Sequence, residues 1–301
     1  MPATTKQKQQ RMEHMIGIGL VNRATLTWAT NVVLGRWLRD HIGPLTLAAA
    51  RFLIASACFA ALLSRRSPED RRLGRDRWLL LGMAVSGVVL FAPTLYLGLR
   101  LTTAVNATLL NGLGPLITGL LAALLIREPM SRRQVTGGII GLAGVISLMS
   151  GGSLASWQAM RGNPGDLITL GAVALWGLYS VLGRRVMQGR SALSATALSD
   201  FLGLPFLLFA AACEIKTFAV DARPAVILAV LYIGVVPTVI GFLSWNAGVR
   251  RLGSSGAMVF YNPLPLYGAL LGHLFLGESI GAAHLIGGAL IVGGGLWAAR
   301  T

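Results

Sequence analysis

The chain has 301 residues, of which 54% are hydrophobic and only 12% are charged. About a quarter of the residues in soluble globular domains are charged, so this composition excludes an ordinary water-soluble domain. Apolar runs of about 20 residues recur along the chain, the length that a helix needs to cross the hydrocarbon core of a bilayer. We therefore predict an all-α polytopic membrane protein and place it in a bacterial inner (plasma) membrane.

The net charge of +15 does not indicate a nucleic-acid partner. The arginines lie in short links between apolar runs, where they set the orientation of a membrane protein. Cys58 and Cys213 each lie inside an apolar run, so we expect small core residues and neither a disulfide nor a metal site. The sequence contains no phosphate-binding loop and no zinc motif, and we expect no cofactor.

Ten apolar segments follow one another, and each is about as long as a membrane is thick. They span approximately residues 20–38, 44–64, 77–98, 102–126, 133–150, 164–184, 191–213, 224–245, 254–276 and 280–299. Several links are only a few residues long, so neighbouring helices must run antiparallel. The sequence thus predicts ten transmembrane helices.

Lys and Arg concentrate on one side of this arrangement. If the N-terminus lies on the inner side and each segment crosses the membrane once, most of the 26 Lys and Arg residues fall in the inner links and termini. The positive-inside rule then places both termini in the cytoplasm. Residues 1–19 include Lys6, Lys8 and Arg11 and lack a small-residue cleavage site, so we interpret them as a cytoplasmic tail and not as a signal peptide.

One long stretch of sequence occurs twice, at a constant offset of 150 residues. Each copy has a proline within an apolar segment, a glutamate at its end and a double glycine beyond it. These residues are Pro115, Glu128, Gly137 and Gly138 in the first copy and Pro265, Glu278, Gly287 and Gly288 in the second. The earlier segments repeat at an offset of 148, where Trp28 and Asn31 match Trp176 and Tyr179.

The chain therefore divides into two five-helix repeats, residues 20–150 and 164–299, joined by a loop at residues 151–163. Because five is an odd number, the second repeat enters the membrane from the opposite side. Inverted repeats of this kind are typical of secondary transporters, whose substrate site lies near the midplane between the repeats.

These repeats, the short loops, the spacing of Pro115 and Glu128 and the glycine-rich last helix of each half resemble the drug/metabolite transporter superfamily in its EamA branch. Within that branch they resemble the amino-acid exporters of the YddG type. The resemblance covers essentially the whole chain and implies export of amino acids or related small metabolites by alternating access. YddG-type exporters tend to have an aromatic residue before the fourth-helix proline. Gly114 stands there in this chain, so a strict preference for aromatic substrates is not implied.

Two charged side chains lie deep within predicted helices, where charge is expensive and usually functional. With a rise of 1.5 Å per residue, Arg51 lies about 10 Å into the second segment and Asp200 about 13 Å into the seventh. As substrate-binding residues, Arg51 would meet a carboxylate and Asp200 an amino group or a proton. The structural alternative is that Arg51 snorkels to the outer interface and Asp200 bonds a neighbouring helix.

Amide and aromatic side chains gather in segments one, three and four and in their copies six, eight and nine. Rings with one polar edge suit a pocket for amino acids with apolar side chains. The further substrate-binding candidates are Trp28, Asn31, Tyr96, Asn111, Trp176, Tyr179, Asn246, Tyr261 and Asn262. The alternative is that aromatic residues form interfacial belts, above all Tyr96 and Trp245 near helix ends, and that asparagines join helices.

Prolines interrupt several predicted helices, and each removes an internal hydrogen bond. In lipid the freed carbonyl must find a partner or lie on a cavity. The candidate gating or kink positions are Pro93, Pro115, Pro237, Pro263 and Pro265. Glu128 and Glu278 end the fourth and ninth segments, where we interpret them as caps for tight turns. Segments five and ten carry glycine stripes, so we expect them to form a scaffold and a homodimer contact.

Two other functions stay open beside amino-acid export. Efflux of drugs or organic cations by the same fold calls for a buried acid, for which Asp200 is the candidate. An intramembrane lipid-modifying enzyme calls for a clustered acid, base or metal set, which the sequence lacks. We therefore predict a transporter and not an enzyme.

Overall fold

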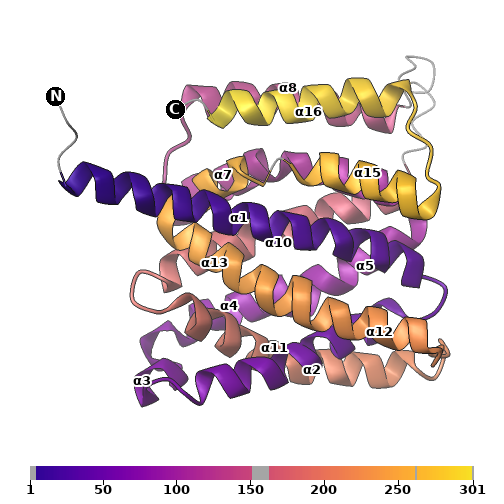
Figure 1. Cartoon of the computed structure of the whole chain (residues 1–301), viewed down its shortest axis with the longest axis horizontal. Helices are drawn as coiled ribbons and strands as arrows, with labels where there is room; N and C mark the ends of the chain where they lie inside the picture. The colour runs from indigo at the N-terminus through magenta and orange to yellow at the C-terminus, as the bar shows by residue number, and fades with distance from the viewer. Residues whose placement is uncertain (1–4, 151–162, 262, 300–301) are drawn as a thin grey trace.

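The computed structural model describes residues 5–150, 163–261 and 263–299, and within these ranges all regular structure is helical (Figure 1). The predicted loop at residues 151–163 lies almost wholly outside them. The elements of the first half are α1 (Thr5–Leu38), α2 (Pro44–Leu63), α3 (Pro68–Arg71), η1 (Gly74–Asp76), α4 (Arg77–Met83), η2 (Ala84–Leu90), α5 (Phe91–Leu101), α6 (Ala104–Leu110), η3 (Asn111–Leu113), α7 (Gly114–Ile126) and α8 (Arg132–Met149). Those of the second half are α10 (Pro164–Val186), α11 (Ala192–Glu214), α12 (Pro224–Ile233), η4 (Gly234–Ile240), α13 (Gly241–Leu252), α14 (Ser254–Val259), α15 (Leu264–Leu276) and α16 (Ala282–Ala299).

Several of these helices are suited to a membrane. Six are long and apolar enough to cross one, and the longest, Pro68–Leu101 and Pro224–Leu252, run through more than one element. The apolar helices Leu264–Leu276 and Ala282–Ala298 are shorter. The chain is therefore a multi-pass membrane protein, as the composition predicts. Helix α1 begins at Thr5, well before the predicted first segment, because Lys, Gln, Arg and Met in its first turns are strong helix formers.

The third and eighth predicted segments each contain a π-helical stretch. These stretches, η2 and η4, begin 150 residues apart, at Ala84 and Gly234. Pro237 lies inside η4, whereas Pro93 is the third residue of α5, just after η2. A π-helical turn shifts the register of the side chains that follow it and often lies at a functional site. The two halves thus share a local distortion at equivalent places.

The fourth and ninth predicted segments are each broken into two helices. Between α6 and α7 lies the short turn η3, and α14 ends at Val259, well before α15 begins at Leu264. Pro115 and Pro265 each lie in the first turn of the second helix, and Pro263 is the N-cap residue of α15. Proline is tolerated there because the first turn has no internal N–H bond to lose. These three prolines therefore begin new helices and do not kink continuous ones.

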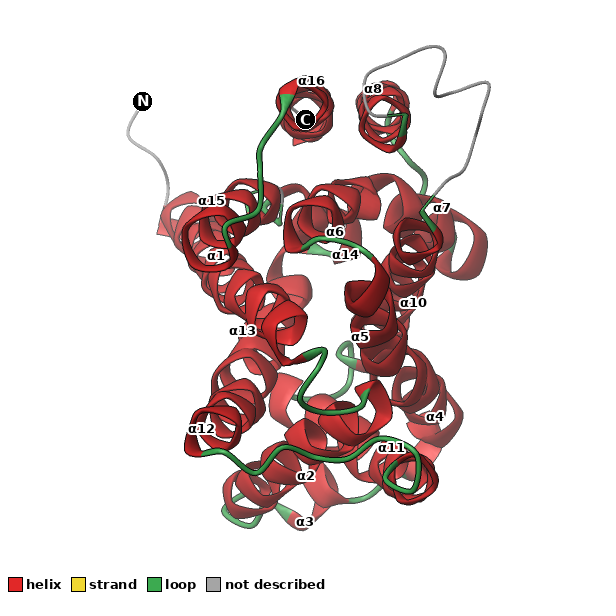
Figure 2. Ribbon diagram, turned by 90° about the vertical axis from the view of Figure 1, so that its right-hand side faces the viewer, coloured by secondary structure: helices red, strands yellow, loops and turns green. Residues whose placement is uncertain are grey.

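The helices lie in layers, with α8 and α16 side by side on one face and α2, α3 and α11 on the opposite one (Figures 1 and 2). Glycines bring α8 and α16 together, because a Cβ atom on Gly137 would lie 2.3 Å from the carbonyl oxygen of Gly294. Gly144 and Gly287 face each other in the same way. The glycine stripes from which a homodimer contact was expected are thus packed against each other within one chain.

The turns after α7 and α15 occupy equivalent places but differ at one residue. Each helix ends in a left-handed residue, Arg127 with φ of 57° and Gly277 with φ of 66°. Glycine adopts this conformation freely, whereas a residue with a Cβ atom is strained in it by about 1 kcal/mol. Arg127 is the only non-glycine residue with positive φ in the described ranges.

We expect Arg127→Gly to raise the free energy of unfolding, and Gly277→Ala to lower it, each by about 1 kcal/mol. Thermal unfolding of both variants in one detergent measures the two shifts. Shifts of the same sign would contradict the conformational explanation.

Candidate functional site

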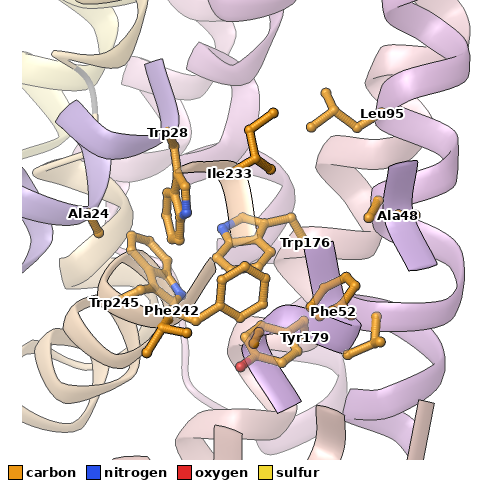
Figure 3. Close-up of a cluster of buried hydrophobic side chains, with 14 of the residues drawn as sticks. Ala24, Trp28, Ala48, Phe52, Leu95, Trp176, Tyr179, Ile233, Phe242 and Trp245 are labelled. Atoms are coloured by element: carbon orange, nitrogen blue, oxygen red, sulfur yellow. The ribbon is translucent and has the colours of Figure 1, made fainter. Parts of the chain in front are cut away.

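A cluster of buried aromatic rings contains side chains from both halves of the chain (Figure 3). Trp28 of α1 and Trp176 of α10, which occupy equivalent positions in the two repeats, lie with their ring centroids 4.8 Å apart. Tyr179 stacks on Trp176 at 4.9 Å, and Phe242 of α13 packs edge-on against Trp176 at 5.1 Å. Each such pair contributes about 0.5–1.5 kcal/mol beyond the burial of its area. The rings therefore form a packed aromatic wall to which both halves contribute.

Arg51 of α2 lies fully buried beside this wall, with 1% of its surface exposed. Its Nη1 donates to the hydroxyl of Tyr96 at 2.8 Å, and its Nε donates to Oγ1 of Thr238 at 2.9 Å. The Tyr96 hydroxyl in turn donates to Oδ1 of Asn31 at 2.8 Å. The guanidinium carbon also lies 5.0 Å from the ring centroid of Phe52, within range of a cation–π interaction. Helices α1, α2 and α5 and the π-helical stretch η4 thus hold this one cation.

The partners of Arg51 are all neutral. In the part of the chain that the structure describes, the ion pairs within 4.0 Å are made by other residues, and none includes Arg51. The charge of the buried Asp200 acts on Arg51 from beyond that distance. A buried cation without a carboxylate in direct contact is costly, so Arg51 is suited to receive an anionic group. Its burial and inward partners do not fit the alternative of snorkelling to the interface.

A small cavity lies between Arg51 and the two tryptophans of the aromatic wall, and all three residues line it. Its volume of about 20 Å³ is room for about one water molecule. A group as large as an amino acid therefore requires the surrounding helices to move apart. The residues that line the cavity are Trp28, Asn31, Val32, Arg51, Phe91, Leu95, Asn111, Trp176 and Tyr261.

Asp200 of α11 forms a second buried polar group. It is 0% exposed, its Oδ2 accepts a hydrogen bond from Ser56 at 2.9 Å, and its Oδ1 has no hydrogen-bond partner. Near it, Nδ2 of Asn246 donates to the Tyr179 hydroxyl and to Thr196 Oγ1, both at 2.6 Å. Buried polar atoms usually have partners, so an unpaired carboxylate oxygen at this depth points to a ligand or a proton.

Other polar atoms of the site are also unpaired. Nε1 of Trp176 and Oδ1 of Asn246 are buried without a hydrogen-bond partner. By contrast, the indole of Trp28 donates to the carbonyl of Pro237 at 2.8 Å, and the Tyr261 hydroxyl donates to Oδ1 of Asn111 at 3.3 Å. Nε1 of Trp176 and Oδ1 of Asn246 are therefore available to form hydrogen bonds with a ligand.

The structure brings together most of the residues predicted to bind substrate. Trp28, Asn31, Arg51, Asn111, Trp176 and Tyr261 line the cavity, and Tyr96, Tyr179 and Asn246 bond or stack on residues around it. Asp200 lies near this group and does not line the cavity. Asn262 lies outside the described residues. The belt alternative for Tyr96 and Trp245 does not fit, because they are 2% and 0% exposed and lie in the core.

Sequence reasoning missed several residues of the site. Val32, Phe91 and Leu95 line the cavity, and no signal separates them from the many other apolar residues of these helices. Thr238 was missed as a partner of Arg51, although a hydroxyl next to Pro237 in an apolar run is a usable signal. At Gly114, a Cβ atom would lie 3.2 Å from Sδ of Met258 and 4.0 Å from the Tyr261 ring. A larger residue there would therefore press on Met258 and Tyr261.

Comparison with known proteins shows the family to which this chain belongs. The model of the EamA-like transporter family matches the chain twice, over residues 15–150 and 163–299. The chain belongs to the EamA-like transporter family. The resemblance predicted from the sequence is thereby confirmed, and the chain is a transporter and not an enzyme.

Some of the relatives that this chain matches are named as amino-acid exporters, and others only as transporters. The chain is 26% identical to a probable terminal-alkyne amino-acid exporter of Streptantibioticus cattleyicolor, over 89% of this chain and 88% of that protein. It is 27% identical to the aromatic amino acid exporter YddG of Ancylobacter novellus, over 90% and 92% of the two chains. A crystal structure of a protein with 25% sequence identity has a TM-score of 0.63 over 97% of this chain and 96% of that one.

We expect Tyr96→Phe to lower the free energy of unfolding by about 1–3 kcal/mol, because it leaves a buried guanidinium N–H without its acceptor. Tyr267→Phe is the matched control, since the Tyr267 hydroxyl makes no hydrogen bond within the described residues. Thermal unfolding in detergent compares the two variants. Equal shifts would show that the hydrogen bond to Arg51 does not stabilise the fold.

Proposed function

We propose that this protein exports amino acids and related small metabolites from the cytoplasm by alternating access. The observation that carries the proposal is Arg51, a buried cation whose hydrogen-bond partners are neutral and which lines a small cavity between the two halves. Names of relatives support the substrate class, and the chemistry of the cavity supports it independently.

In the proposed bound state, the α-carboxylate of the substrate binds Arg51. A guanidinium group presents its donors in a planar fork that matches a carboxylate, and two parallel hydrogen bonds form. The apolar part of the substrate then packs on Trp28, Trp176 and Tyr261, whose faces accept side chains of many shapes. Asp200 receives the α-amino group or exchanges a proton. Few fixed charges take part, so specificity is broad among neutral amino acids.

Alternating access follows from two inverted repeats of five helices, with both termini in the cytoplasm. Two similar halves in opposite orientations can exchange conformations, and the swapped state has nearly the same energy. The cavity then opens to one side and to the other without chemical energy. The equivalent breaks at η2 and η4, and between α6–α7 and α14–α15, support this plan because helices bend where hydrogen bonds are interrupted.

Efflux of organic cations is the second candidate function. Asp200 favours it, because a buried carboxylate with an unpaired oxygen suits a positively charged substrate. Arg51 opposes it, because a cation in the cavity repels a cationic substrate. Counterflow in liposomes with labelled neutral amino acids and labelled organic cations separates the two functions.

We expect Arg51→Gln to reduce amino-acid counterflow by at least about tenfold, since a charge-assisted pair contributes about 1.5–3 kcal/mol. Arg223→Gln, at an exposed arginine before α12, is the control and leaves counterflow unchanged. Full counterflow by Arg51→Gln would contradict the role of Arg51 in carboxylate binding.

We expect Asp200→Asn to leave amino-acid counterflow measurable and to abolish its response to an imposed pH gradient. Asparagine keeps the shape of the side chain and can still accept from Ser56, but it exchanges no proton at neutral pH. Wild-type and variant proteins are compared in liposomes with and without the gradient. If the variant responds as the wild type does, proton coupling does not pass through this residue.

A further inference from the structure

Glu278, at the end of α15, binds the start of a helix from the other half. Its two carboxylate oxygens accept hydrogen bonds from the backbone N–H groups of Ala104 and Val105, each at 2.9 Å. These groups lie in the first turn of α6, whose positive dipole end attracts a carboxylate. The contact joins the α5–α6 turn of the first half to the α15–α16 link of the second. It is therefore a contact that must break if the halves separate at this end.

Arg36, near the end of α1, completes this contact. Its Nη1 donates to the carbonyls of Leu99 and Arg100 at the end of α5, at 2.8 and 3.3 Å. Its Nε lies 3.8 Å from Glu278, and only 18% and 10% of the two side chains are exposed. Arg36 thus holds the carbonyl end of α5 while Glu278 holds the amide end of α6. We call the pair Arg36 and Glu278 the first latch.

The same residues recur at the opposite end of the molecule. Glu128 matches Glu278 at an offset of 150, and Arg184 matches Arg36 at an offset of 148. Nη1 of Arg184 donates to the carbonyl of Arg250 at 2.9 Å, as Arg36 does to Arg100. Glu128 accepts a hydrogen bond from Ser254 in the first turn of α14, in the same way that Glu278 contacts the first turn of α6. We call Arg184 and Glu128 the second latch.

The second latch is not closed. Glu128 accepts only one side-chain hydrogen bond, from Ser254 at 3.3 Å, and no ion pair within 4.0 Å joins it to Arg184 in the described ranges. A cavity of about 630 Å³ lies at this place. It is lined by Leu125, Ile126, Arg127, Glu128, Pro129, Arg184, Arg185 and Gln188. Equivalent residues are therefore joined at one end of the molecule and separated by open space at the other.

We propose that the two latches are the alternating gates of the transporter, and that in this structure the first is closed and the second is open. This inference rests on the proposed alternating access, and it names the residues that control it. When α14 closes on Glu128, the Arg184–Glu128 pair forms and the Arg36–Glu278 pair breaks. The closed latches have similar contacts, so neither state is favoured by a large margin. The cationic surface around the open latch also attracts an anionic carboxylate group on the side from which substrate enters.

The test measures the two gates directly, in the full-length protein without substrate. Cys58 and Cys213 are replaced by alanine, and spin labels are attached through Leu101→Cys and Ile280→Cys for the first latch. Arg250→Cys and Met130→Cys carry the labels for the second latch in a separate protein. Distances between the labels, measured in nanodiscs, give the ratio of open to closed molecules for each gate.

We expect Glu278→Gln to shift the first gate about tenfold towards the open state, since it weakens charge-assisted hydrogen bonds to two N–H groups. Glu128→Gln shifts the same gate in the opposite direction or leaves it closed. The double variant returns the ratio towards that of the parent protein. This restoration is the decisive result, because two unrelated structural defects would not compensate each other.

An unchanged distance distribution in Glu278→Gln would overturn the proposal, and so would opening of the first gate by Glu128→Gln. If Glu278→Gln does not fold, Arg36→Gln weakens the same latch and gives the same two outcomes. No amino acid is present in the experiment. If the distances do not respond to the substitutions, the latch proposal is wrong and the proposed substrate is unaffected. If amino-acid counterflow fails instead, the proposed substrate is wrong and the measured gate motions still stand.

Discussion

The arrangement of the centre of this protein depends on the burial of one guanidinium group. Arg51 is buried, and a cation there is costly unless several hydrogen-bond acceptors surround it. Tyr96, Asn31 and Thr238 come from three different parts of the chain to meet it. The need to surround the buried guanidinium group with acceptors constrains the positions of these three side chains. It also constrains α1, α5 and η4, on which they lie. The small volume of the cavity follows, because the partners of Arg51 draw these helices together.

The two halves share a backbone plan and differ in chemistry at equivalent positions. Trp28 and Trp176 are the same residue at equivalent positions, and they meet in the aromatic wall. Asn31 is replaced by Tyr179, and Asn111 faces its own counterpart, Tyr261, in a hydrogen bond across the halves. The proposed substrate, an amino acid, has no such symmetry, because its charged and apolar parts lie at different ends. Equivalent helices can therefore move alike while they contact different parts of one substrate.

Much of this arrangement could be predicted from the sequence, because membrane burial makes polar residues conspicuous. Arg51, Asn31 and Trp176 stand out in apolar runs, and the offsets of 148 and 150 residues pair the halves without a structure. The π-helical stretches could not be predicted, since η2 contains no proline and its apolar sequence resembles that of any other span. The burial of Trp245 was also hidden, because the end of a helix does not reveal whether its face turns to lipid or inward. Phe91 lacked a signal because nothing in the sequence separates it from the other apolar residues of its span.

The interlocked glycines of α8 and α16 have a consequence for the assembly of the protein. A helix with such a glycine face packs closely against a second helix that offers the same kind of face. In the present protein the two faces meet inside one molecule, at Gly137 with Gly294 and at Gly144 with Gly287. A contact of the kind that could join two subunits is thus internal to one chain. The one-to-one stoichiometry that two separate chains would have to reach by diffusion is set here by covalent linkage.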